Sequence, residues 1–231
     1  MVDFALAPER TALLNIDMQN LFVEGFQTSA PDGLATLARI NQLAAVCRGA
    51  GVLVIHVSHV LRPDGSNMGT LATLHPKVRA GLLRKGGTAT ALHRALDRDP
   101  RDLLLEKPRY GAFHGTDLEL ILRGRGIDTV IIAGIATNIC CDTTAREAAV
   151  RDFRVLFLRD GTATSGAVDL AADVVQASTL ATIDDAFGQV LSVDEAIRKI
   201  RGANSRRARD AAERARLVDT DRQVGLHTPE S

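Results

Sequence analysis

Short apolar runs rich in β-branched residues recur along the chain, and each has the length of a β-strand. Segments with helical spacing of apolar residues separate most of these runs. The expected strands are 12–16, 52–57, 103–105, 130–133, 155–158 and, with a weaker pattern, 190–193. The expected helices are 34–47, 91–96, 117–122, 143–151 and 167–183.

Strands that alternate with helices form βαβ units, and such units build a parallel sheet that is covered by helices on both faces. Glycines mark several of the expected helix ends, with Gly49 and Gly51 after the first helix and Gly124 and Gly126 before the fourth strand. The pattern therefore predicts a doubly wound α/β domain of about six strands, which we place at residues 1–200.

Two regions interrupt this alternation. Residues 61–87 are rich in glycine and proline and form a long irregular connection, of the kind that often serves as a lid or a subunit contact. Residues 201–231 mix arginine with acidic residues and contain few large apolar ones. This charged tail is either disordered or a helix that packs on a partner subunit, and composition does not separate the two.

Charge and composition exclude several classes of function. The chain carries 28 Lys and Arg against 28 Asp and Glu, so it has no global positive charge for nucleic acid or an anionic membrane. No apolar run is long enough to span a bilayer, and the first residues do not have the pattern of a signal peptide. Three cysteines, an odd number, fit reduced thiols better than a disulfide framework, so we expect a cytoplasmic protein.

Candidate catalytic residues follow three of the expected strands. Asp17 follows the first strand, Lys107 follows the third, and Cys140 follows the fourth, after Gly134. Ligands of an open parallel sheet bind beyond the carboxyl ends of its strands, so these side chains are expected at one edge. A thiol nucleophile needs a base, and a cation stabilises the resulting thiolate. Taken singly, each residue has an ordinary alternative: a turn cap for the aspartate, a solvated surface lysine, and a small buried cysteine.

Two cysteines are adjacent, and helical spacing separates their environments. The stripe through Cys141 continues to Ala145 and Ala148, as on a helix face that packs against the sheet. Cys140 lies off that face, in the first turn of the expected helix, where unpaired N–H groups and the helix dipole favour thiolate over thiol. We therefore expect Cys140 to be the nucleophile and Cys141 to be a packing residue.

Three motifs in this order resemble those of the isochorismatase-like family of cysteine hydrolases. They are D-x-Q-x-x-F at 17–22, Lys-Pro at 107–108 and G-x-A-T-N-x-C at 134–140, and the resemblance covers roughly residues 10–195. It implies a six-stranded parallel sheet and an Asp17–Lys107–Cys140 triad. It also implies a cis peptide bond between Ile135 and Ala136, with the backbone amides of Ala136 and Cys140 as oxyanion donors.

The same resemblance bears on the reaction. Members of the family that cleave isochorismate, a vinyl ether, do not have the cysteine, whereas those with the cysteine mostly hydrolyse C–N bonds in small amides and ureides. The resemblance therefore implies hydrolysis of a small amide or ureide through a thioester. Helical patterns rich in alanine and leucine, such as residues 34–45, together with the long connection at 61–87, favour a homo-oligomer (dimer or tetramer). A catalytically inactive subunit with a binding or assembly role, or an ether hydrolase, remains the alternative.

No cofactor is expected. Nicotinamidases of this family carry an Asp-x-His metal motif after the second strand, but this chain has His56 and His59 there and no aspartate. His56 is expected to be a core histidine with hydrogen-bond partners. A Rossmann-type nucleotide site is not indicated either, because the first strand is not followed by a glycine-rich loop. The candidate pocket residues, which ordinary packing would explain equally well, are Phe22, His59, Tyr110, Phe113 and His114.

Overall fold

Six parallel strands form one sheet in the computed structural model, which describes residues 2–224 and the side-chain surroundings of residues 2–211. The order across the sheet is β3-β2-β1-β4-β5-β6. The expected six-stranded parallel sheet is confirmed. The strands are β1 (Thr11–Ile16), β2 (Leu53–His59), β3 (Leu103–Lys107), β4 (Thr129–Ile135), β5 (Arg154–Ala163) and β6 (Gln189–Leu191).

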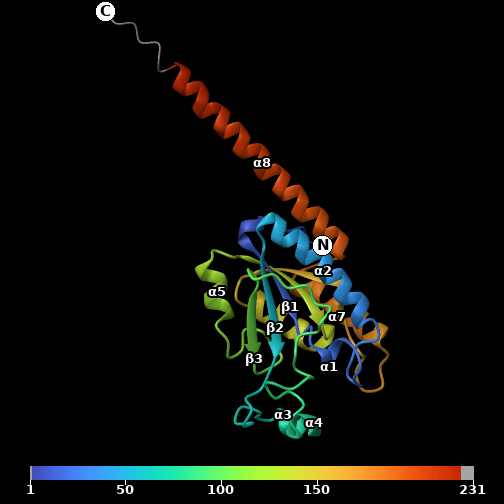
Figure 1. Ribbon diagram of the computed structural model, residues 1–231. Helices are drawn as coiled ribbons and strands as arrows, with labels where there is room; N and C mark the ends of the chain where they lie inside the picture. Colours follow the sequence, from blue (N-terminus) through green and yellow to red (C-terminus); the bar gives the residue numbers. More distant parts are fainter. Residues whose placement is uncertain (1, 225–231) are drawn as a thin grey trace, which may run out of the picture.

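Helices cover both faces of the sheet, and each face has its own apolar core (Figure 1). Helices α2 (Gly33–Ala50) and the start of α8 (Val193–Val224) pack on one face. On the other face lie α5 (Leu118–Gly124), α6 (Asp142–Ala149) and α7 (Ala172–Ala186). Because both faces are covered, every residue of β1 and β4 is buried, which explains their almost continuous apolar sequences.

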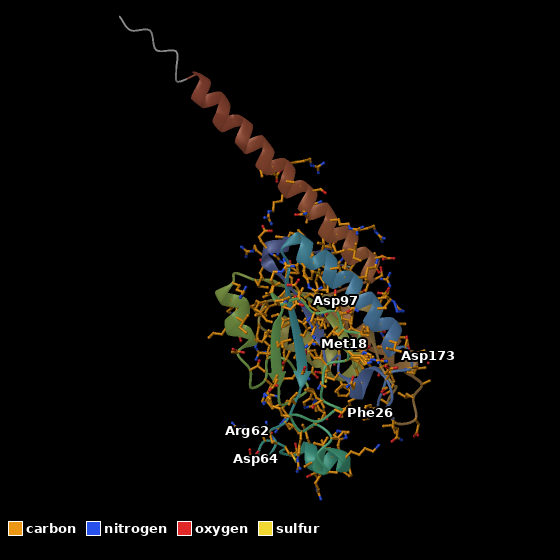
Figure 2. The ribbon with its side chains drawn as sticks, in the orientation of Figure 1. Met18, Phe26, Arg62, Asp64, Asp97 and Asp173 are labelled. Carbon is orange, nitrogen blue, oxygen red and sulfur yellow. The ribbon has the colours of Figure 1, made fainter. Side chains whose placement is uncertain are left out.

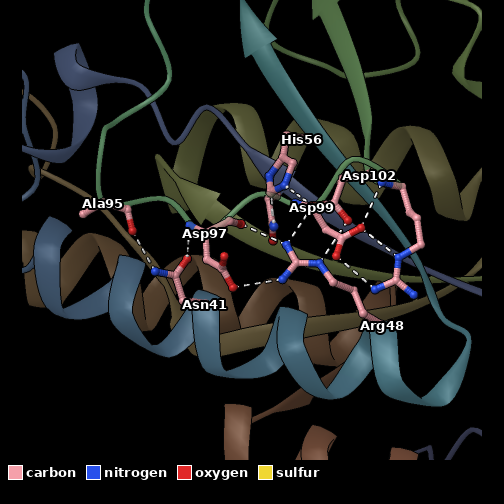
Figure 3. A network of polar contacts seen from close by, with 9 residues as sticks. Asn41, Arg48, His56, Ala95, Asp97, Asp99 and Asp102 are labelled. Atoms are coloured by element: carbon pink, nitrogen blue, oxygen red, sulfur yellow. Dashed lines mark hydrogen bonds and ion pairs between the residues drawn. The ribbon is translucent and has the colours of Figure 1, made fainter.

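A buried polar network lies where α2 passes the start of β3 (Figure 3). One imidazole nitrogen of His56, Nε2, lies 3.0 Å from Asp102 Oδ2, and the other, Nδ1, lies 3.3 Å from Asn15 Nδ2. Asp102 also accepts two hydrogen bonds from Arg48, at 3.0 and 2.7 Å. The expectation that His56 is a core histidine with hydrogen-bond partners is confirmed.

One predicted helix is wrong: residues 91–96 form turns and an isolated bridge between Gln19 and Leu92. The backbone bonds of this segment go to a distant part of the chain, from His93 N to Met18 O and from Asn20 N to Ala91 O. A six-residue pattern is too short to hold a helix by itself, and tertiary hydrogen bonds decide its conformation here. In addition, the predicted helix 167–183 begins only at Ala172.

The connection after β2 is more ordered than its composition suggests. It contains two short helices, α3 (Leu71–Leu74) and α4 (Pro76–Arg79), and a bridge between Leu61 and Arg84. Figure 2 shows Arg62 and Asp64 on the outside of this connection, below the sheet. Its apolar side chains form a small cluster of their own with Leu21, namely Leu61, Met68, Leu71, Val78 and Leu83.

Helix α8 crosses the expected boundary at residue 200 without interruption and continues to Val224. Its first turns pack on α2, and the rest extends away from the body of the molecule (Figure 1). Residues 225–231 of the expected tail lie outside the described residues. Within residues 2–224, no helix is both long and apolar enough to cross a membrane. The remaining short elements are η1 (Pro8–Arg10), α1 (Asn20–Val23) and η2 (Thr137–Cys141).

Candidate active site

The strand order places a switch point between β1 and β4. The chain proceeds from β1 outward to β2 and β3, then returns to the other side of β1 and continues outward from β4 to β6. At such a point the connections leave in opposite directions, and in open α/β sheets ligands bind there, beyond the carboxyl ends of the strands. Asp17 directly follows β1, and the turn that contains Cys140 directly follows β4.

Asp17 and Lys107 form a fully buried ion pair at this edge. The Lys107 ammonium donates to Asp17 Oδ2 at 2.8 Å and to the carbonyl of Arg109 at 3.1 Å, and both side chains have 0% exposure. Lys107 ends β3, so its side chain passes the end of β2 to reach Asp17 beyond β1. A buried lysine is stable as an ammonium only when it is paired in this way.

Gln19, two residues after Asp17, fixes the main chain around the carboxylate. Its Nε2 donates to the carbonyls of His59 and Thr90, and its Oε1 accepts from the amide of His59 at 2.9 Å. Asp17 itself has φ of +53°, a left-handed conformation that is uncommon outside glycine. The first motif therefore supplies both a carboxylate and the amide that holds its surroundings. The sequence pattern contained Gln19 but did not indicate its role.

The turn after β4 brings Cys140 to the pair. Gly134 has φ of +129°, and a Cβ there would lie 2.0 Å from the carbonyl oxygen of Ile16, so only glycine fits beside β1. The peptide bond between Ile135 and Ala136 is cis. The π-helical turn η2 follows and carries both cysteines, and α6 begins after it at Asp142. Cys140 Sγ, a carboxylate oxygen of Asp17 and a ring nitrogen of His59 lie within 4.8 Å of one another.

Both cysteines are buried in the core between α6 and the sheet, and of the two it is Cys140 that clusters with Asp17 and His59. Cys141 is completely buried with Ala145 and Ala148 in the core between α6 and the sheet. Cys140 retains 4% exposure, and its carbonyl accepts a hydrogen bond from the Thr144 hydroxyl at 2.6 Å. All three cysteines of the chain are free thiols.

The prediction that the surroundings of Cys140 favour the thiolate over the thiol was wrong. Burial and the neighbouring Asp17 carboxylate raise the pKa of the Cys140 thiol well above its ordinary value, and Lys107 offsets this only in part. Burial also raises the pKa of Asp17, against the opposing effect of Lys107. Burial acts to lower the pKa of Lys107, but the charge and the hydrogen bond of the Asp17 carboxylate act against it, so that the pKa is raised and the ammonium stays protonated. The resting site is therefore a thiol beside a carboxylate whose basicity is increased by burial.

Asp17 offers a free oxygen for a proton. Its Oδ1 is buried and has no hydrogen-bond partner in residues 2–211, whereas Oδ2 is engaged by Lys107. Cys140 Sγ is the nearby acid. The arrangement therefore provides a route for the thiol proton to Asp17 when a substrate carbonyl is attacked.

Tyr110 connects the site to the long connection after β2. Its ring meets the His59 imidazole edge to face, with centroids 5.9 Å apart, and its hydroxyl lies 3.0 Å from His75 Nε2. Arg109 also contacts this connection, since it donates to the carbonyl of Asn67 at 2.9 Å. The structure thus brings two of the predicted pocket residues, His59 and Tyr110, together.

The other predicted pocket residues lie in different settings. Phe22 is half-buried between the small cluster of the connection and the core on the α2 face. Phe113 packs in the core, 5.8 Å from the ring of Phe153 and beneath the guanidinium of Arg151, so the packing alternative describes its contacts. His114 is exposed and lines an open surface cavity of about 610 Å³ together with Arg62 and Arg109.

Asp17, His59 and Cys140 are also the one cluster of possible metal ligands found in the described part of the chain. The donor set suits a soft divalent ion. However, the Lys107 ammonium already lies 2.8 Å from the carboxylate that such an ion would bind. A second positive centre there would be repelled, so these residues fit a metal poorly.

Comparison with known proteins shows which sequences this chain is similar to. A family model described as an isochorismatase domain matches residues 11–195. Among curated proteins, a ureidoacrylate amidohydrolase RutB of Methylorubrum extorquens is 34% identical over 210 residues, which covers 82% of each chain. RutB of Enterobacter sp. (strain 638) is 32% identical over 208 residues, 81% of this chain and 87% of the relative.

Solved structures agree in fold. A cysteine hydrolase from Pseudomonas syringae pv. phaseolicola 1448A is 34% identical and superposes with a TM-score of 0.84, covering 87% of this chain and 97% of the other. An isochorismatase family protein from Burkholderia thailandensis is 30% identical and superposes with a TM-score of 0.73, covering 85% of this chain and 98% of the other. The similarity therefore spans the whole sheet and the turn that carries Cys140.

Proposed function

This chain belongs to the isochorismatase family, and from that premise we propose that it is a cysteine hydrolase that cleaves a C–N bond of a small amide or ureide. One observation carries the proposal: a buried Asp17–Lys107 ion pair with the Cys140 thiol beside it, at the switch point of the sheet. The names of the RutB relatives, ureidoacrylate amidohydrolases, support this class of reaction and substrate.

The first half of the reaction forms a thioester. Cys140 Sγ attacks the substrate carbonyl carbon while its proton passes to Asp17, whose free Oδ1 and raised pKa suit it as the acceptor. The carbonyl oxygen becomes an oxyanion, which the backbone N–H groups of Ala136 and Cys140 stabilise. The tetrahedral intermediate then expels the nitrogen, which takes the proton from Asp17 and leaves as an amine or ammonia.

The second half restores the enzyme. Water attacks the thioester carbonyl and gives a proton to Asp17, and collapse releases the carboxylic or carbamic acid together with the Cys140 thiolate. The thiolate recovers its proton from Asp17. Lys107 remains an ammonium throughout, holds the Asp17 carboxylate in place, and lowers the cost of negative charge in a buried site.

The alternatives are less well supported. An ether hydrolase would have no use for a thiol placed beside a basic carboxylate, and the RutB names point to amide chemistry. A binding or assembly subunit would have no need to bury Asp17 and Lys107 as an ion pair, because a buried pair with a free carboxylate oxygen costs stability.

The test is a panel of small primary amides and ureides, including ureidoacrylate, assayed for ammonia release by the wild type and by Cys140→Ala. We expect turnover of at least one ureide by the wild type, no turnover by the variant, and unchanged rates in EDTA because the site fits a metal poorly. Absence of turnover across the panel, or inactivation by EDTA with rescue by zinc, would count against the proposal.

A further inference from the structure

Helix α6 carries a second stripe of side chains besides the one that packs on the sheet. Thr144, Glu147 and Arg151 recur at helical spacing after Cys140. All three contact the loop at 109–113, which follows β3. The mechanism above uses none of these three side chains.

The loop at 109–113 is part of the site because it holds the catalytic lysine. The carbonyl of Arg109 accepts a hydrogen bond from the Lys107 ammonium at 3.1 Å. Burial and Asp17 raise the pKa of the Cys140 thiol, and the Lys107 charge acts against them. The placement of this loop against the helix that follows Cys140 therefore affects how well the ammonium can act on the thiol.

The hydroxyl of Thr144 joins the loop to the cysteine directly. It accepts a hydrogen bond from the Ala112 amide at 3.1 Å and donates one to the Cys140 carbonyl at 2.6 Å. Thr144 has 0% exposure and both bonds are buried, so loss of the hydroxyl would leave a buried amide without a partner. One side chain thus connects the main chain of the nucleophile to the loop that holds the lysine.

Glu147 supports the same contact farther along α6. Its Oε2 accepts a hydrogen bond from the Phe113 amide at 3.1 Å. A Cβ at Gly111 would lie 2.1 Å from this oxygen, so the glycine leaves the space that the carboxylate occupies. Two successive amides of the loop are therefore bound by side chains of α6, and of these two side chains Thr144 is the one that also binds Cys140.

We propose that Thr144 is a positioning residue, whose hydroxyl holds the Cys140 main chain against the loop that binds Lys107 and so keeps the thiol and the ammonium close together. The inference rests on the proposed function, because the groups that Thr144 positions are those of that reaction. Without the hydroxyl the loop moves away from the helix, and the effect of the Lys107 charge on the thiol weakens with distance. Small displacements of this kind lower reactivity although no reacting group is lost.

The experiment measures how fast iodoacetamide alkylates Cys140 in the folded protein at mildly alkaline pH, with tandem mass spectrometry to separate Cys140 from Cys141. Thr144→Val replaces the hydroxyl by a methyl group of similar size, and we expect it to slow alkylation by at least about 10-fold. Thr144→Ser keeps a hydroxyl that both donates and accepts, so its rate should stay within about threefold of the wild type.

The matched control is Thr182→Val on α7. The Thr182 hydroxyl also donates to the carbonyl four residues before it, that of Ser178 at 3.0 Å, but it is exposed and joins no loop to the helix in the residues described with side chains. This variant should be alkylated at the wild-type rate.

The direction of the change separates positioning from a general loss of structure. A loosened fold would expose the buried Cys140 thiol and let its raised pKa fall toward the ordinary value, which speeds alkylation, whereas a weaker effect of Lys107 slows it. Circular dichroism checks each fold, and Cys47, which has 0% exposure, should stay unreactive. Thr144→Ala removes the same hydroxyl and replaces Thr144→Val if the latter does not fold.

A folded Thr144→Val that reacts as fast as the wild type or faster, or a Thr144→Ser that is equally slow, would overturn the inference. Alkylation does not require turnover, so the result separates the two proposals. Slow alkylation of Thr144→Val that serine restores supports the positioning role even if no amide of the panel is hydrolysed. Hydrolysis of ureides by the wild type, with an unchanged alkylation rate in Thr144→Val, upholds the proposed function and overturns the role of Thr144.

Discussion

Cys140 and Cys141 are neighbours with the same side chain, and we predict different roles for them. Cys141 is fully buried against Ala145 and Ala148, and Cys140 Sγ lies beside the Asp17 carboxylate. We expect Cys140→Ala to abolish ammonia release while keeping the fold. Cys141→Val should retain most of the activity, because a valine replaces a small apolar side chain in a packed core. An inactive but folded Cys141→Val, together with an active Cys140→Ala, would reverse the assignment.

The acid–base pair gives a second prediction at this scale. Asp17→Asn removes the acceptor of the thiol proton, and Lys107→Ala removes the charge that stabilises it, so each should lower kcat/KM by at least about 100-fold. Because burial raises the pKa of Asp17, the acid limb of the kcat/KM profile should have its midpoint above the ordinary carboxyl value of about 3.9. Steady-state kinetics across pH and thermal melts of both variants check this, and a near-normal rate in either folded variant would contradict the triad.

The sequence predicted the identities of the candidate site residues better than their ionisation. Asp17, Lys107 and Cys140 could be chosen because each follows a strand, and strand ends of a parallel sheet meet at one edge. The raised pKa of Cys140 could not be predicted, because it depends on how deeply the thiol is buried and how close Asp17 lies.

At the level of elements, local patterns identified the strands but not their order. Each apolar run became a strand within a few residues, because a strand buried on both faces needs such a sequence. The order that places β1 beside β4 is set by long-range packing, which a single sequence does not display. The segment 91–96 has a helical pattern but is held by bonds to Met18 and Asn20, so tertiary contacts override its local preference.

The network around Asp102 gives the prediction for this scale (Figure 3). Arg48 is 9% exposed and joins α2 to Asp102, which is 3% exposed. Arg48→Met should lower the free energy of unfolding by about 3 kcal/mol, because it leaves a buried carboxylate without its cation. The control is Arg101→Met, which removes an ion pair with Asp99. Because the Arg101 side chain is 72% exposed, this variant should lower the free energy of unfolding by less than about 1 kcal/mol. Urea titrations that give equal losses for the two variants would contradict this account.

The same network predicts a dependence on pH. Burial acts to raise the pKa of Asp102, but hydrogen bonds from Arg48, the Asp99 amide and His56 outweigh it and hold that pKa below its ordinary value. The stabilisation is therefore present above about pH 3.9, where the unfolded carboxyl ionises, and is lost as pH falls through the lower folded value. The difference between wild type and Arg48→Met should shrink in urea titrations carried out below about pH 4.

On the scale of the whole molecule, α8 differs from every other helix in having an inner and an outer part. Its inner part packs on α2 through Ile197, Ile200 and Ala203, and an ion pair joins Arg207 to Glu9. A helix of 32 residues is about 48 Å long, so its outer part extends well beyond these contacts (Figure 1). Helical segments without tertiary packing are marginal in water, which favours a packing partner for the outer part over an isolated helix.

We therefore predict that the chain is a homo-oligomer in which the outer part of α8 packs on another subunit. Light scattering at micromolar concentration should give at least twice the mass of one chain. A chain that ends at Ala211 keeps the contacts of Ala203 and Arg207, so it should fold normally. Its oligomer should dissociate, so that light scattering gives a lower particle mass than for the full-length chain. Sedimentation of both forms over a range of concentrations checks the assignment, because the extent of oligomer dissociation depends on protein concentration. An oligomer with a truncated interface should begin to dissociate at a higher protein concentration than the full-length oligomer. A full-length monomer would refute the oligomer, and a truncated chain with unchanged mass would move the interface elsewhere on the molecule.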